Sequence, residues 1–105
     1  MARAIGQNAA VSDAYNDAKK PGGKHHGFLR QLSAMGPRQR QKATDSYREQ
    51  VELHLDKISL PQKYVEDWDD LRDTHKAALI RNWKKEVEDR LEQIEILKGY
   101  EDENH

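Results

Sequence analysis

Cysteine is absent from this chain of 105 residues, so a disulfide framework and a thiolate metal or redox site are both excluded. Long apolar runs are absent too, because no stretch approaches the ~20 residues that cross a bilayer. The first five residues, Met-Ala-Arg-Ala-Ile, lack the apolar core of a signal peptide. The sequence therefore predicts a soluble chain without stable membrane insertion, which crosses a membrane only if something else carries it.

Apolar residues are also scarce, at 35% of the chain, and charged residues are just as frequent, at 35%. A chain of this length forms one domain with a modest core, here predicted to span residues 1–105. So little apolar surface favours narrow stripes on amphipathic helices over a sheet sandwich. The predicted fold is all-α: a small helical bundle with two long antiparallel helices, at about 37–58 and 70–98, and shorter N-terminal helices.

The two long helices are predicted from apolar residues at helical spacing. In the first helix, the residues expected on one buried face are Ala43, Tyr47, Val51, Leu55 and Ile58. In the second, they are Leu71, Leu79, Ile80, Trp83, Val87, Leu91, Ile94 and Leu97. Trp68 and Trp83 have aliphatic neighbours at this spacing, which favours core packing over stacking on unpaired bases.

Proline and glycine predict where these helices begin and end. Pro37 suits the first turn of a helix, and Pro61 ends one because the residue before proline avoids the helical region. Gly99 is predicted as the left-handed C-terminal cap of the second long helix. Residues 1–7 and 100–105 are expected to be flexible ends. The outer face of the last helix is interpreted as a solvated charge face without chemistry; its residues are Lys84, Lys85, Glu86, Glu88, Asp89, Arg90 and Glu92.

Charge is divided along the chain, although the formal net charge is only −1. Residues 1–45 carry a net charge of +5, and the remaining sixty carry −6. The basic half suits a polyanion, and the acidic half suits a basic partner. Attraction between the two halves explains the same pattern, so both interpretations remain open.

Three glycines, a lysine and two histidines fall within residues 21–28, Pro-Gly-Gly-Lys-His-His-Gly-Phe. Free backbone torsions at glycine let main-chain N–H groups approach a ligand, and Lys24 adds a cation there. We therefore predict that Gly22, Gly23 and Lys24 contact a phosphate of the substrate. A tight connection between two helices uses the same glycines, and that alternative stays open.

The histidines suggest how a phosphodiester bond is cleaved. Cleavage of RNA without a metal needs a base, an acid and a cation, and two histidines with a lysine meet those needs. The predicted catalytic residues are His25 or His26 from the loop and His54 from the margin of the first long helix, with Lys57 beside it, or else Lys24, as the cation. Ser46 and Gln50 continue along that margin and are predicted to bind substrate. The alternative for His54 is a partly buried histidine satisfied by a hydrogen bond.

Other kinds of site fit less well. Metal binding by His25, His26 and His54 is not assigned, because adjacent histidines rarely share an ion and no carboxylate stands beside them in sequence. We therefore predict no metal and no cofactor. The spacing of a phosphate-binding P-loop is absent, since Gly22-Gly23-Lys24 is followed by His25. No glycine-flanked serine suggests acyl transfer.

Taken together, several segments resemble small helical C-terminal toxin modules of bacterial polymorphic toxins, of the contact-dependent growth-inhibition or Rhs type. They are Asp13-Ala-Tyr-Asn16, Ala18-Lys-Lys-Pro-Gly-Gly-Lys-His-His-Gly-Phe28, Ser46 through Glu52-Leu-His-Leu-Asp-Lys-Ile58, Pro61, Trp68, Trp83-Lys and Glu92-Gln-Ile-Glu-Ile-Leu97. The resemblance runs from about residue 12 to 99.

The resemblance implies a domain cut from a larger secreted protein, delivered into the cytoplasm of a neighbouring bacterium and neutralised by a cognate immunity protein. Many such modules are nucleases, often directed at tRNA, and the matching residues are His25, His54 and Lys57. Two other functions compete with a metal-independent ribonuclease. One is a non-catalytic helical module that binds a protein partner, and the other is nucleic-acid binding without catalysis, which the overall acidity disfavours.

Overall fold

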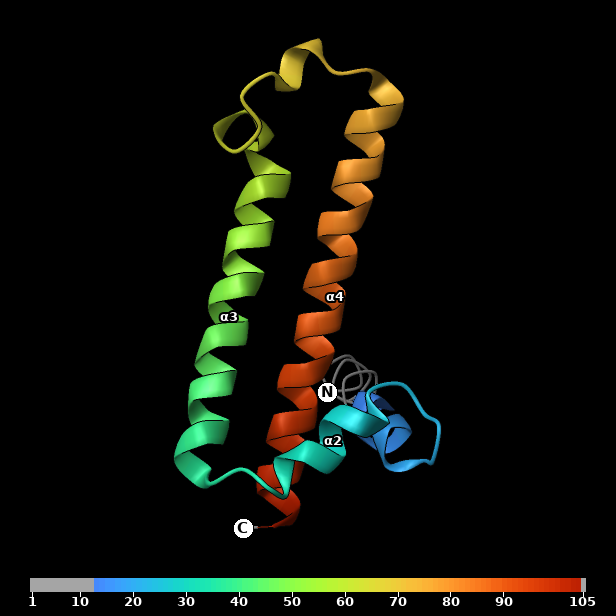
Figure 1. The fold of residues 1–105 in the computed structure, drawn as a ribbon, viewed down its shortest axis with the longest axis vertical. Helices are drawn as coiled ribbons and strands as arrows, with labels where there is room; N and C mark the ends of the chain where they lie inside the picture. The colour runs from blue at the N-terminus through green and yellow to red at the C-terminus, as the bar shows by residue number, and fades with distance from the viewer. Residues whose placement is uncertain (1–12, 105) are drawn as a thin grey trace, which may run out of the picture.

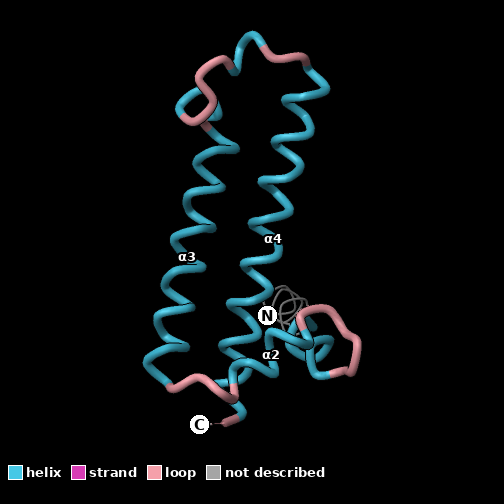
Figure 2. Tube along the Cα trace, viewed as in Figure 1, coloured by secondary structure: helices cyan, strands magenta, loops and turns pink. Residues whose placement is uncertain are grey.

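The computed structural model describes residues 13–104, which form an all-α fold dominated by one long helical hairpin (Figure 1). Figure 2 shows helices joined by loops and turns, without a strand in this part of the chain. The order is helical residues 13–19, α2 (His26–Leu32), α3 (Pro37–Ser59), the 3₁₀ helices η1 (Pro61–Lys63) and η2 (Trp68–Asp70), and α4 (Asp73–Glu103). The predicted bundle with two long helices is therefore confirmed.

α3 begins and ends close to where the sequence predicts. Pro37 is its first residue, where the missing N–H is not needed, and Gln39 accepts a hydrogen bond from the Gly36 N–H at 3.0 Å. The helix ends at Ser59, because Leu60 before Pro61 leaves the helical region with φ −132°. After it the chain forms two single 3₁₀ turns, η1 and η2, before α4 begins.

α4 differs from its predicted bounds at both ends. It starts at Asp73 rather than about residue 70, and it continues to Glu103 rather than stopping near residue 98. Gly99 is therefore not a C-terminal cap. A Cβ built at Gly99 would lie 2.5 Å from Cγ of Tyr15, so the glycine makes room for a tyrosine ring from the N-terminal helix. Of the two predicted flexible ends, residues 1–7 lie outside the described part, and residues 100–103 belong to α4.

The buried core lies at one end of the hairpin, where α2 and residues 13–19 cross α4 (Figure 1). The buried cluster consists of Ala18, Leu32, Ile96 and Leu97. Around it pack partly buried side chains, including Phe28 and Tyr47, whose rings lie 5.9 Å apart. We call this end the proximal end and the turn between α3 and α4 the distal end.

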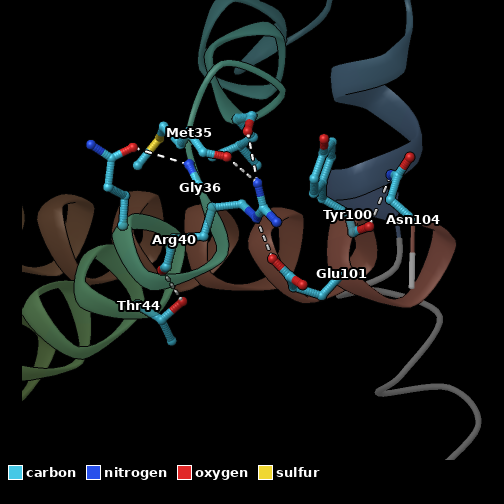
Figure 3. A network of polar contacts seen from close by, with 9 residues as sticks. Met35, Gly36, Arg40, Thr44, Tyr100, Glu101 and Asn104 are labelled. Atoms are coloured by element: carbon cyan, nitrogen blue, oxygen red, sulfur yellow. Dashed lines mark hydrogen bonds and ion pairs between the residues drawn. The ribbon is translucent and has the colours of Figure 1, made fainter.

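Arg40 joins three elements at the proximal end (Figure 3). Its guanidinium donates hydrogen bonds to the carbonyl of Leu32, the last residue of α2, to the carbonyl of Met35 just after it, and to the Glu101 carboxylate of α4. It also lies 4.9 Å from the centre of the Tyr100 ring. Only 12% of the Arg40 side chain is exposed, so this residue ties the end of α2 to α3 and α4 from a largely buried position.

The distal end has no third helix over it in the described part of the chain (Figure 1). Trp68 is buried and stacks on Trp83 with ring centres 6.0 Å apart, which agrees with the predicted core packing. Two residues predicted in buried stripes are nevertheless exposed: Leu55 at 48% and Leu91 at 49%. A two-helix hairpin buries only the facing seam, so side chains at the edges of each stripe remain in water.

None of the described helices is long and apolar enough to span a membrane.

Candidate functional site

The glycine segment forms a tight turn that presents Lys24 and His25 to α4. Gly22 has φ +77°, and the Gly23 N–H donates to the Lys20 carbonyl at 2.8 Å. His25 also has a positive φ, 66°, which is uncommon for a residue with a side chain. Backbone strain of this kind is often found at functional sites, where surrounding contacts hold it in place.

Gly23 packs against backbone, which explains why a glycine stands there. A Cβ at this position would lie 1.9 Å from the carbonyl oxygen of Asp17, whereas a Cβ at Gly27 would meet nothing within 4 Å. Close packing therefore requires a glycine at position 23, as expected for the alternative interpretation, a tight connection between two helices. The predicted contact of Gly23 with a phosphate remains a prediction.

We expect Gly23→Ala to destabilise the protein by about 1–3 kcal/mol, because the turn has to move away from Asp17. Gly27→Ala is the matched control. It lies in α2 with open space around it and should be neutral or stabilising by up to about 1 kcal/mol through helix propensity. Urea unfolding of both variants measures the difference, and equal stabilities would show that the turn accommodates a side chain.

Four side chains meet where the turn touches α4, and we call them the loop cluster: Lys24, His25, Asp89 and Glu92. The His25 Nε2 lies 2.9 Å from Glu92 Oε1, and Lys24 Nζ lies 2.8 Å from the same oxygen. Lys24 Nζ also lies 3.2 Å from Asp89 Oδ1. Asp89 and Glu92 share one face of α4 because they are three residues apart. The cluster therefore joins parts of the chain that are distant in sequence.

The charges in the loop cluster stabilise one another. Burial raises the pKa of Glu92, but hydrogen bonds from Lys24 and His25 outweigh burial, and the net pKa lies below its ordinary value. The pKa of Lys24 is raised, chiefly by its hydrogen bond to Glu92. Lys24 therefore remains a cation, and its ammonium is already paired with two carboxylates.

The other predicted catalytic residues lie elsewhere. His26 turns its Nδ1 to the Ala18 carbonyl at 2.7 Å, and His54 turns its Nδ1 to the Gln50 carbonyl of its own helix at 2.8 Å. Lys57 Nζ lies 5.9 Å from the centre of the Tyr64 ring. The glycine turn lies on the side of α4 away from α3 (Figure 1). Among the described residues, no hydrogen bond or ion pair joins His25 or His26 to His54 or Lys57.

The predicted substrate-binding pair, Ser46 and Gln50, has a structural role between the helices. Gln50 Oε1 accepts a hydrogen bond from Arg90 Nε at 2.7 Å, and its amide nitrogen donates to Ser46 Oγ at 3.3 Å. Two shallow hollows on the described surface, of about 430 and 350 Å³, are lined by none of the predicted catalytic residues. The described contacts thus place Ser46 and Gln50 within the helical hairpin and do not join them to the glycine turn.

Two members of the loop cluster, Asp89 and Glu92, were missed by sequence reasoning. Both belong to the α4 face that was interpreted as solvated charge, yet the side chain of Glu92 is only 28% exposed. No carboxylate stands beside the histidines in sequence, but the fold brings two from α4 to His25. Glu92 begins the last segment of the toxin resemblance, and that was the signal available in the sequence.

Comparison with protein-family models, with curated proteins and with solved structures finds no match to this chain.

Proposed function

We propose that this chain is the toxin module of an interbacterial competition system, a ribonuclease whose centre is the loop cluster. The observation that supports it most is the pairing of His25 with Glu92, 67 residues away, with the Lys24 ammonium on the same carboxylate oxygen. An imidazole oriented by a carboxylate is the arrangement that general bases use in several unrelated enzymes. The toxin assignment itself rests on the sequence resemblance.

In the proposed reaction, Glu92 accepts the Nε2 proton of His25 as a hydrogen bond, which leaves Nδ1 as the base. Nδ1 removes the proton from a ribose 2′-hydroxyl, the 2′ oxygen bonds to phosphorus, and the bond from phosphorus to the 5′ oxygen breaks. The leaving oxygen takes a proton from water, and His25 returns its proton to solvent. Lys24, with 55% of its side chain exposed, turns from the carboxylates toward the negative charge that develops on the phosphate.

This proposal needs no metal or cofactor, and the substrate is RNA, with tRNA the candidate that the resemblance suggests. The net charge of +5 over residues 1–45 favours approach of a polyanion to the turn. In the same proposal, the module is delivered by a larger secreted protein, acts in the cytoplasm of the target bacterium and is neutralised by a cognate immunity protein.

Induced expression in bacteria is expected to stop growth and to fragment RNA, as total RNA on a gel would show. The purified chain should cut the same RNA in the presence of chelator, because the proposed groups are an imidazole and an ammonium. The His75→Ala variant serves as the control for substitutions in the loop cluster and should behave as the parent does. His75 is exposed near the start of α4 and lies outside the loop cluster. Normal growth with intact RNA would reject the proposal.

A non-catalytic interaction module is the second candidate, and the distal end favours it. Leu53, Leu60 and Tyr64 are exposed there at 43%, 52% and 36%, which suits a hairpin covered by a protein partner. This function predicts harmless expression and a partner whose binding weakens when surface charges of the acidic half, residues 46–105, are reversed. Binding that ignores such reversals would eliminate it.

A further inference from the structure

The loop cluster also holds atoms that could bind a metal, and the ribonuclease proposal uses two of the three residues that carry them, His25 and Glu92. One nitrogen of His25 and one carboxylate oxygen each of Asp89 and Glu92 lie within 4.8 Å of one another. All three side chains are partly buried, with exposed fractions of 14%, 32% and 28%. His25 is held by the glycine turn, and Asp89 and Glu92 lie on one face of α4. The backbone of these two elements therefore brings the three side chains together.

The spacing suits a small tetrahedral ion. Two ligands of a zinc ion lie about 3.4 Å apart when each is about 2.1 Å from the metal. His25 Nε2 and Glu92 Oε1 are 2.9 Å apart, so a small rotation of either side chain gives that separation. An oxygen of Asp89 completes a set of three protein ligands.

Lys24 already shows that a cation is stable at this place. Its ammonium bridges the two carboxylates at 3.2 and 2.8 Å, where a metal ion would also bridge them. An ion pair with a half-exposed lysine contributes little in water, so the lysine can leave at small cost. A divalent ion binds there more favourably than the Lys24 ammonium does. It places two positive charges instead of one between the carboxylates, and it also bonds to the imidazole.

We propose that His25, Asp89 and Glu92 form a zinc site, which zinc occupies by displacing the Lys24 ammonium. Zinc suits the donor set better than magnesium or calcium, because imidazole is a ligand for zinc and both other ions prefer oxygen. Three protein ligands leave one position for water or a further ligand. The inference does not depend on the ribonuclease proposal, although bound zinc would inhibit that reaction by holding the His25 ring and removing Lys24.

Calorimetric titration of the full chain with zinc chloride tests the site, with magnesium chloride as the comparison ion. One zinc per chain is expected for the parent, with no heat from magnesium. His25→Gln and Glu92→Gln should each weaken zinc binding at least about 10-fold, because each removes one of three ligands. Lys24→Met should tighten it by about 3-fold or more, because the competing cation is gone. His75→Ala should bind as the parent does.

Cobalt substitution adds a readout that is independent of heat. Four-coordinate cobalt absorbs visible light strongly, and His25→Gln should abolish that absorbance. Because both measurements report binding alone, they remain informative whether or not the chain cleaves RNA. Zinc binding that is absent in the parent, or unchanged in His25→Gln and Glu92→Gln, would overturn the proposal. Circular dichroism of each variant shows that a lost signal reflects the site and not the fold.

Discussion

His25→Ala should cleave RNA at least about 100-fold more slowly than the parent chain, because general acid–base catalysis contributes about 100- to 10,000-fold. Among the described histidines, His25 is the one whose imidazole the structure pairs with a carboxylate, through Glu92 Oε1 at 2.9 Å. Glu92→Gln should give a smaller loss, since the amide keeps a hydrogen bond but no longer stabilises a charged imidazole. Rates are measured on purified chains in chelator, with initial velocities over a range of pH.

His54→Ala separates the loop cluster from the set that sequence reasoning suggested. The ring of His54 is bound to the Gln50 carbonyl within α3, so the proposal expects a rate within about twofold of the parent. A large loss in His54→Ala with no loss in His25→Ala would restore His54 and Lys57 as the centre. A pH profile that keeps its shape in Glu92→Gln would show that the carboxylate does not act through the imidazole.

Ile96→Ala should lower the free energy of unfolding by about 2–5 kcal/mol, the second large effect that the structure predicts. Ile96 is fully buried in a cluster of only four buried residues, so the lost contacts have few substitutes. A domain of this size is stable by only about 5–15 kcal/mol, which makes this loss a large fraction of the total.

Leu91→Ala is the matched control, because Leu91 lies in the same helix but is 49% exposed. Its truncation should cost less than about 1 kcal/mol. Urea denaturation with equal slopes for both variants gives the comparison. Similar losses for the two would mean that Leu91 is buried in solution, as the apolar spacing alone suggested.

Sequence reasoning predicted the fold from features that act locally. Pro37 and Pro61 set the bounds of α3 through their own backbone geometry, so no tertiary information was needed. Gly99 was misread because a glycine after an apolar stripe has two uses. A glycine can end a helix, or it can leave space for a side chain of another segment. At Gly99 that side chain is the ring of Tyr15.

The candidate site was predicted in part. The turn and His25 were identified from composition, but their partners depend on which face of α4 the turn meets. Glu92 alternates with other charges along that face, and this charge pattern does not distinguish it from residues in water. The link between His25 and Glu92 therefore follows from tertiary packing, which one sequence without relatives does not reveal.

The concentration of fully buried side chains at the proximal end makes the two ends of the hairpin unequal in local stability. Amide protons near the turn between α3 and α4 are protected only by the seam between two helices, so they exchange through partial opening. Amide protons around Leu32 and Ile96 exchange only when the whole domain unfolds. The loop cluster sits beside that protected region, so its geometry persists while the far turn opens and closes.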